Sequence, residues 1–174
     1  MAKILILYST TDGHTRSICE RLQEVAADGN EVDLIAMADQ PDIDIAPYDK
    51  VVIGASIRYG KHKKEVFDFI ERNRAALEEK TNAFFSVNVV ARKPEKNTPE
   101  TNPYLQKFLK KIAWKPANLA VFAGMLDYPS YGPFDRTMIR FIMWMGKGPT
   151  DPTLTVEFTD WGKVEEFGQR IRNM

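Results

Sequence analysis

The chain has few of the features that mark secreted or metal-binding proteins. It contains one cysteine, Cys19, and two histidines among 174 residues. An internal disulfide and a multi-cysteine metal site are therefore excluded, and we expect no metal ion. The apolar run Ile4–Tyr8 has only five residues, too few for a signal-peptide core or a membrane-spanning helix. These absences predict a cytoplasmic protein.

The chain also lacks a net charge, yet its charges are unevenly distributed. Lysine plus arginine and aspartate plus glutamate each number 24. Residues 51–150 carry 17 basic and 9 acidic side chains, whereas residues 1–50 carry 4 basic and 10 acidic ones. The middle of the chain is therefore better suited to an anionic neighbour than its N-terminal part.

Apolar runs alternate with helical patterns along most of the chain. Strands are predicted at 4–8, 31–36, 50–55, 83–90 and 119–123, and helices at 15–27, 66–77, 103–113 and 164–171. This alternation predicts an α/β fold, a doubly wound five-stranded parallel sheet with helices on both faces, as a single domain over 1–174. An insertion near the fifth strand, about 125–151, interrupts the rhythm. Residues 154–158 form either a short strand or an extension of the sheet.

The turn after the first strand is a candidate binding site, because ligands of doubly wound sheets bind beyond the carboxyl ends of the strands. Its hydroxyls, single glycine and helix-start amides suit a phosphate. The predicted binding residues are Ser9, Thr10, Thr11, Asp12, Gly13, His14 and Thr15. The loop lacks the lysine of triphosphate loops and the three glycines of dinucleotide loops, so a mononucleotide monophosphate fits better. A merely capped helix start is the alternative.

The ends of two further strands supply groups that can surround a flat heterocycle. Main-chain atoms of such loops can hydrogen-bond the edge of the ring while apolar side chains cover its faces. The predicted residues are Ser56, Ile57, Arg58, Tyr59, Gly60, Ser86, Val87, Asn88 and Val89. A phospho-acceptor receiver domain would need an aspartate where Ala55-Ser56 stands, which makes that alternative weak.

These residues resemble known families at two levels. The pattern Ile6-Leu-Tyr-Ser-Thr-x-x-Gly-x-Thr15 is similar to the phosphate-loop motif of flavodoxins. Three longer segments resemble the quinone-dependent protoporphyrinogen IX dehydrogenases of bacterial haem biosynthesis, and the similarity runs nearly end to end. These segments are residues 8–16, 51–60 and 86–96.

The resemblance implies a flavodoxin-like enzyme that binds FMN, oxidises protoporphyrinogen IX to protoporphyrin IX and reduces menaquinone or ubiquinone. It implies that Ser9–Gly13 and Thr15 hold the FMN phosphate, while Ser56–Gly60 and the loop after Phe85 border the flavin ring. It identifies no catalytic side chain. A flavodoxin-type electron carrier and an NAD(P)H:quinone reductase stay open as alternatives. Nucleic acid is not among the expected partners.

Basic residues around the predicted site favour an anionic substrate or an anionic membrane surface. They are Arg58, Lys61, Lys63, Lys64, Arg92, Lys93 and Lys96. Most of them are expected to be ordinary surface charges, and Arg58 is the exception. The hypothesis is that Arg58 contacts an anionic substrate.

Residues 133–146 are predicted to form an amphipathic helix that Gly132-Pro133 opens and Gly146 closes. One narrow face carries the cations Arg136, Arg140 and Lys147. The opposite apolar stripe consists of Phe134, Met138, Phe141, Ile142 and Met145. Three interpretations stay open for the segment 134–146: a lid or core helix, a contact in a homo-oligomer, or a peripheral anchor at the cytoplasmic face of the inner membrane.

Three single side chains receive simpler interpretations. His62, in the run Gly-Lys-His-Lys-Lys, is expected to be exposed, and Cys19 to be a small buried residue. His14 either approaches the phosphate or faces solvent.

Overall fold

The computed structural model describes all 174 residues and has a parallel sheet at its centre. Its strands are β1 (Lys3–Ser9), β2 (Glu31–Ala36), β3 (Lys50–Ser56), β4 (Thr81–Val87) and β5 (Asn118–Phe122). They run in the order β2-β1-β3-β4-β5, and every neighbouring pair is parallel. This arrangement confirms the predicted fold class.

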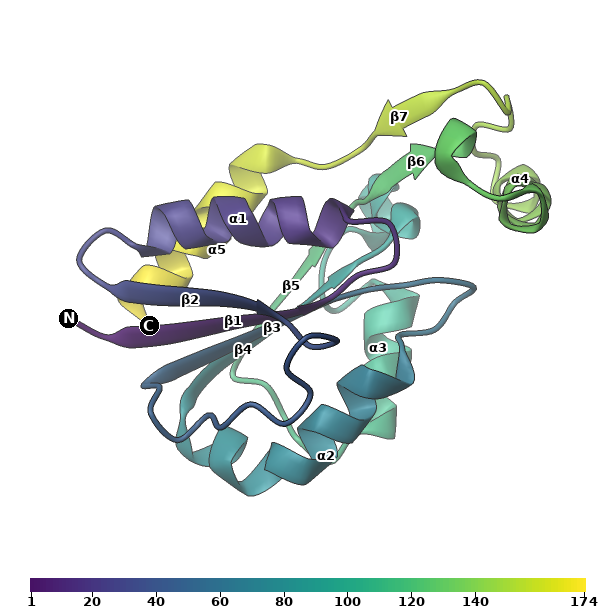
Figure 1. Ribbon diagram of the computed structural model, residues 1–174. Coiled ribbons are helices and arrows are strands. Elements are labelled where there is room, and N and C mark those ends of the chain that lie inside the picture. The colour runs from purple at the N-terminus through teal and green to yellow at the C-terminus, as the bar shows by residue number, and fades with distance from the viewer.

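Helices cover both faces of the sheet. Figure 1 shows α1 (His14–Ala26) and α5 (Trp161–Asn173) on one face, and α2 (Lys64–Glu79) and α3 (Pro103–Lys111) on the other. Alternate side chains of β1 enter two different cores: Ile4 and Ile6 pack beneath α1 and α5, while Leu5 and Leu7 pack toward α2 and α3. All four are completely buried. A strand buried on both faces must be apolar at every position, which explains the continuous run in the sequence.

One close approach fixes a glycine in the middle of the sheet. Gly54 on β3 lies beside Phe85 on β4, and a Cβ at position 54 would collide with the Phe85 ring. The ring continues into an aromatic cluster with Phe122 and Phe167 beneath α5. The glycine therefore makes room for the aromatic core below α1 and α5.

Several predicted boundaries differ from the observed ones by two or three residues, and two of the differences have a local cause. The strand predicted at 83–90 ends at Val87, and Val89–Arg92 forms the short 3-10 helix η1. The side chain of Asn88 accepts a hydrogen bond from the Ala91 amide at 3.1 Å, which turns the chain out of the sheet. The helix predicted at 103–113 ends two residues early because Ile112 is extended.

The excursion between β5 and α5 carries its own small structure. It contains β6 (Met125–Asp127), the 3-10 turn η3 (Tyr128–Ser130), α4 (Pro133–Met145) and β7 (Thr155–Glu157). β7 pairs antiparallel with β6 in a separate two-stranded sheet, so it does not extend the main sheet. The Phe158 amide donates to the Gly124 carbonyl at 3.0 Å, which brings the entrance and exit of the excursion together.

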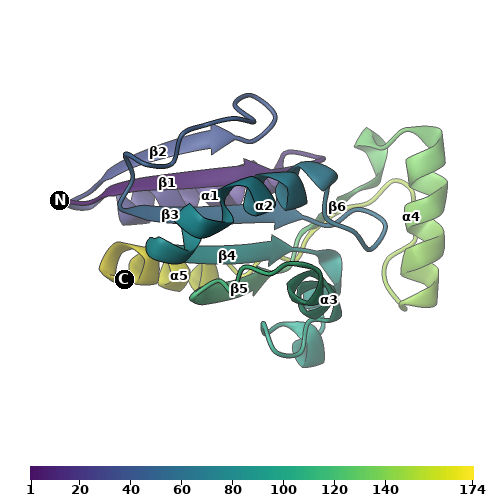
Figure 2. The ribbon, with the colours of Figure 1, turned by 90° about the horizontal axis from the view of Figure 1, so that it is seen from below.

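The excursion stands beyond the carboxyl ends of the central strands. Figure 2 shows α4 opposite those ends, while both chain termini lie at the far end of the sheet. A separate cluster holds it together, made of Leu126, Tyr128, Tyr131, Ile139 and Met143. α4 therefore lies over the edge where a doubly wound fold binds its ligands.

No helix in the structure has both the length and the apolar composition needed to cross a bilayer.

Candidate functional site

The loop between β1 and α1 presents unoccupied hydrogen-bond donors. Gly13 precedes the helix with a left-handed φ of 88°, a conformation that favours glycine, and its amide donates to Thr10 Oγ1 at 3.0 Å. No side chain caps α1. The structure thus departs from the capped helix start considered above, and the first helical amides stay free for an anion.

Two buried hydroxyls beside this loop have no partner. Thr15 Oγ1 at the start of α1 and Ser56 Oγ at the end of β3 are both buried without a hydrogen bond. Both residues line a cavity of about 70 Å³ beyond the strand ends. An unsatisfied buried hydroxyl costs about 1–3 kcal/mol, so such groups mark a place where a polar ligand completes the structure.

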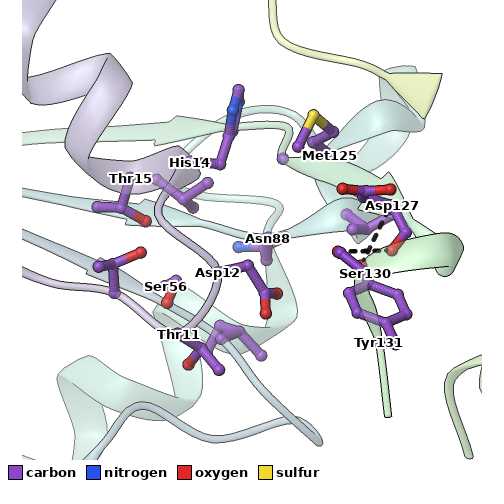
Figure 3. A pocket seen from close by; sticks show the side chains of 15 residues that line it. Thr11, Asp12, His14, Thr15, Ser56, Asn88, Met125, Asp127, Ser130 and Tyr131 are labelled. Carbon is purple, nitrogen blue, oxygen red and sulfur yellow. Dashed lines mark hydrogen bonds between the residues drawn. The ribbon is translucent and has the colours of Figure 1, made fainter. Parts of the chain in front are cut away.

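Three strand-end loops and the excursion meet around this cavity, as Figure 3 shows. Ten of the predicted residues line it: Thr10, Thr11, Asp12, His14, Thr15, Ser56, Ile57, Val87, Asn88 and Val89. Five further lining residues were not predicted: Gly124, Met125, Asp127, Ser130 and Tyr131. The sequence showed that an insertion interrupts the rhythm at about 125–151, but no local pattern indicated which of its residues would reach the site.

Three of the predicted residues line neither this cavity nor the second, larger cavity beside it. Ser9 is buried and its hydroxyl donates to Glu65 Oε1 at 2.6 Å, and Gly13 only shapes the helix start. Ser86 is fully buried, with its hydroxyl 3.0 Å from His62 Nε2. Ser9 and Ser86 thus lie in the buried layer behind the loops, and Gly13 sets the conformation of the loop before α1.

A second, larger cavity adjoins the first. It has a volume of about 460 Å³ and shares Asp12, Ile57, Asn88, Val89, Met125 and Tyr131 with the smaller one. The remaining predicted residues, Arg58, Tyr59 and Gly60, line this second cavity. Its opposite wall is the inner side of α4, which is rich in methionine. The polar loop end and the apolar chamber together form one elongated site.

A short ion-pair network lies at the border of the two cavities. The Arg58 guanidinium contacts the Asp12 carboxylate, and its Nη1 lies 3.4 Å from Asp135 Oδ2 on α4. Burial disfavours the charged guanidinium, but the bond to Asp12 and the two carboxylate charges outweigh it and raise the pKa of Arg58. The Tyr59 hydroxyl also donates to Asp135. These contacts tie the β3–α2 loop to both α1's loop and α4.

The two histidines lie in different surroundings. His14 Nε2 lies 2.6 Å from Thr159 Oγ1, and burial lowers the pKa of His14 although Glu157 opposes the shift. The expectation that His62 is exposed was wrong: the residue is 7% exposed, against the rings of Phe84 and Phe108. Burial lowers the pKa of His62 to about 4, so the ring is neutral at pH 7.

The fold and this geometry agree with what comparison with known proteins finds. A model of the flavodoxin domain matches residues 5–153. The chain belongs to the flavodoxin family. It is 44% identical over 173 residues to the protoporphyrinogen IX dehydrogenase (quinone) of Escherichia coli K12, covering 99% of this chain and 96% of that protein. It is also 44% identical to the Leishmania major protein of the same name, over 95% of this chain and 72% of the relative.

Solved structures of flavodoxins share the fold. Oxidised Flavodoxin 1 from Bacillus cereus superposes with a TM-score of 0.58 at 17% identity, covering 99% of this chain and 98% of that one. A flavodoxin from the domain Archaea gives a TM-score of 0.55 at 13% identity, covering 98% and 96%. These likenesses show that the chain shares the flavodoxin fold.

The cofactor of the flavodoxin domain is FMN, and the residues present fit it. The uncapped start of α1 and the orphaned hydroxyl of Thr15 suit its phosphate. The loops around Ile57 and Val89 offer apolar side chains and main-chain groups to a flat ring. No lysine or arginine lines the smaller cavity, as expected for a phosphate held by amides and hydroxyls.

Cys19 is completely buried in α1, as predicted, and burial raises the pKa of its thiol far above the ordinary range. The side chain is therefore part of the core beneath α1.

Proposed function

We propose that this chain is an FMN-dependent protoporphyrinogen IX dehydrogenase that uses a respiratory quinone as its electron acceptor. The observation that carries the proposal is the 44% identity to the E. coli protein of that name, over nearly the full length of both chains. The elongated site is consistent with it, because a polar anion-binding end adjoins an apolar chamber of about 460 Å³.

The reaction requires hydrogen to leave the porphyrinogen and to reach the quinone. In each step the substrate loses two electrons and two protons. One quinone takes up these two electrons and two protons and becomes a quinol. Three such steps complete the conversion to protoporphyrin IX. FMN, when bound, supplies the two-electron chemistry that no side chain of this protein can provide.

The protein's own residues bind and orient the reactants. We propose that Thr15 and the amides at the start of α1 hold the phosphate, and that Ile57 and Val89 border the ring. The methionine-rich wall of α4 gives the larger cavity an apolar side against which a ring system can pack. We assign no acid or base among the side chains: neutral His62 lies behind Ser86 and reaches neither cavity, and His14 Nε2 is paired with the Thr159 hydroxyl.

An anaerobic assay tests the proposed function. Purified protein loaded with FMN is mixed with protoporphyrinogen IX and menaquinone, and porphyrin fluorescence is followed. We expect fluorescence to rise only when protein, FMN and quinone are all present. Quinone reduction driven by NADPH without porphyrin formation would instead indicate a reductase. Turnover that needs a protein reductase would indicate an electron carrier.

We further propose that the outer side of α4 attaches the protein to the cytoplasmic face of the inner membrane, where the quinone is dissolved. Phe134 and Trp144 on this helix are 71% and 69% exposed, and Phe141 is exposed as well. Arg140 is exposed on the same helix, where it can meet anionic headgroups. A homo-oligomer contact through the same side chains is the competing explanation.

A further inference from the structure

The larger cavity combines an apolar wall with a few charged side chains. Its apolar wall comes from Met138, Ile139, Ile142, Met143 and Met145 on α4. Only three charged residues line it: Asp12, Arg58 and Arg92. A mostly apolar chamber with a few charged groups at its border recognises a large apolar ligand that carries a charge at a defined place.

The two arginines differ in what they contact. Arg58 is already paired with the carboxylates of Asp12 and Asp135. Arg92 forms no ion pair within the chain. It makes only two hydrogen bonds, both to carbonyl oxygens: from Nη1 to Val89 at 3.2 Å and from Nη2 to Gly146 at 3.0 Å. Arg92 is therefore the cation of this cavity that still lacks a carboxylate partner.

The position of Arg92 keeps its guanidinium fixed and available. The bond to Gly146 anchors it at the end of α4, and it also lies over the ring of Phe158. A guanidinium has five N–H donors, so most of them are left over. Arg92 lines the cavity and is only partly buried, so a ligand there can reach the remaining donors. Partial burial, which lowers the pKa of Arg92, strengthens attraction to an anion.

We propose that the cavity between α4 and the strand-end loops receives the tetrapyrrole, and that Arg92 binds one of its propionate carboxylates. This inference rests on the proposed function, because the substrate class comes from there. The porphyrinogen is large, mostly apolar and carries two propionates, whereas the quinone is apolar and carries no carboxylate. Arg92 therefore offers the electron donor a contact that the electron acceptor cannot make.

Binding measurements test this without turnover. Protoporphyrin IX and its dimethyl ester, which lacks the carboxylates, are titrated into FMN-loaded protein in the same dilute detergent, with fluorescence as the readout. We expect the wild type to prefer the diacid by about tenfold or more, as for a charge-assisted hydrogen bond. Arg92→Gln should abolish most of this preference, and Arg92→Lys should retain part of it. Lys110→Gln removes an exposed charge on α3 and should behave as the wild type.

The ratio of the two affinities separates recognition from structural damage. Loosening of α4 in Arg92→Gln would weaken both ligands equally, and an unchanged ratio would overturn the inference. A loss of FMN affinity with the porphyrin preference intact would overturn it too, by assigning Arg92 to the cofactor. In steady-state assays, Arg92→Gln should raise KM for protoporphyrinogen IX about tenfold and leave KM for menaquinone unchanged. Absence of wild-type turnover would refute the proposed function. The preference for the diacid over the dimethyl ester is measured without turnover, so it tests the role of Arg92 independently.

Discussion

Asn88 and Asn102 exchange two side-chain hydrogen bonds inside the protein. Asn88 Nδ2 donates to Asn102 Oδ1 at 3.2 Å, and Asn102 Nδ2 donates to Asn88 Oδ1 at 3.0 Å. Asn102 is completely buried and also caps α3 through the Leu105 amide. Because Asn88 lines both cavities, this pair links the rigid start of α3 to the binding site.

Replacing Asn102 with alanine should therefore affect both stability and cofactor binding. The variant loses a helix cap and the two buried hydrogen bonds to Asn88, which keeps only its bonds to Ser86 Oγ and the Ala91 amide, so we expect the free energy of unfolding to fall by about 2–4 kcal/mol. FMN affinity should fall as the loop at Asn88 becomes mobile. Urea denaturation and fluorescence titration measure the two effects. Asn73→Ala, which removes a bond to a carbonyl of its own helix, should change neither; wild-type stability in Asn102→Ala would contradict this account.

The orphaned hydroxyl of Thr15 gives a sharper test of the phosphate site. Thr15→Val keeps the shape of the side chain and removes a buried hydroxyl that has no partner in the protein, so stability without cofactor should be unchanged or slightly higher. FMN affinity should fall about tenfold or more, as for a lost hydrogen bond to a charged group.

Riboflavin, which lacks the phosphate, is the matched control ligand for this variant. Its affinity should be the same for the wild type and Thr15→Val. An equal loss for FMN and riboflavin would show that Thr15 acts on the ring or the loop instead. Titration of both flavins against both proteins by flavin fluorescence decides between these outcomes.

His62 should make stability depend on pH in a defined direction. Its pKa is about 4 in the folded protein and about 6.5 when unfolded, so between these values the unfolded chain binds more protons. Stability from the neutral ring is fully present above pH 6.5 and is lost as pH falls toward 4. Between pH 7 and pH 5 the loss should be about 2 kcal/mol.

Urea denaturation at both pH values measures this slope. His14, whose pKa is also lowered, contributes to the pH dependence in the same direction. The wild type is therefore compared with His62→Gln, so that the difference between the two proteins isolates His62. The variant should have the smaller loss between pH 7 and pH 5. Equal losses in the two proteins would mean that His62 is protonated in the folded state or accessible to water.

Vesicle co-sedimentation tests membrane attachment through α4. Trp144 is the target because it is 69% exposed and lines neither cavity. Trp144→Glu should lower partitioning onto vesicles with anionic lipid by about tenfold, because a large exposed apolar side chain is lost. Ala75→Glu adds the same charge on exposed α2 and should have no effect. Equal partitioning of the three proteins would exclude α4 as the anchor, and a concentration-dependent dimer disrupted by Trp144→Glu would indicate the oligomer contact.

Local sequence patterns were sufficient to predict the sheet and most of the loops at its edge. The strands are buried on both faces, so the runs at 4–8 and 50–55 had to be continuously apolar. Parallel connection then brings the ends of β1, β3 and β4 to one edge, whatever the details of packing. This is why the loops at Thr15, Ser56 and Asn88 could be expected to meet.

Features that depend on long-range contacts could not be predicted. The run around His62 is strongly basic, yet an antiparallel bridge between Arg58 and Lys61 reverses the chain and directs the histidine toward Phe84 and Phe108. Likewise, Tyr131 reaches the site because the Tyr128 amide donates to the distant Leu154 carbonyl across the excursion. Neither contact leaves a periodic signal in the sequence.

The hydrogen bond between the Phe158 amide and the Gly124 carbonyl has a consequence for how this architecture can change. Everything from β6 to β7 leaves and rejoins the main body at one point and has its own apolar cluster. The excursion can therefore be removed or exchanged by joining two adjacent chain ends, without altering the five-stranded core. We expect a shortened protein closed by a tight turn at this point to keep the five-stranded fold and the uncapped start of α1, while losing the α4 wall of the larger cavity.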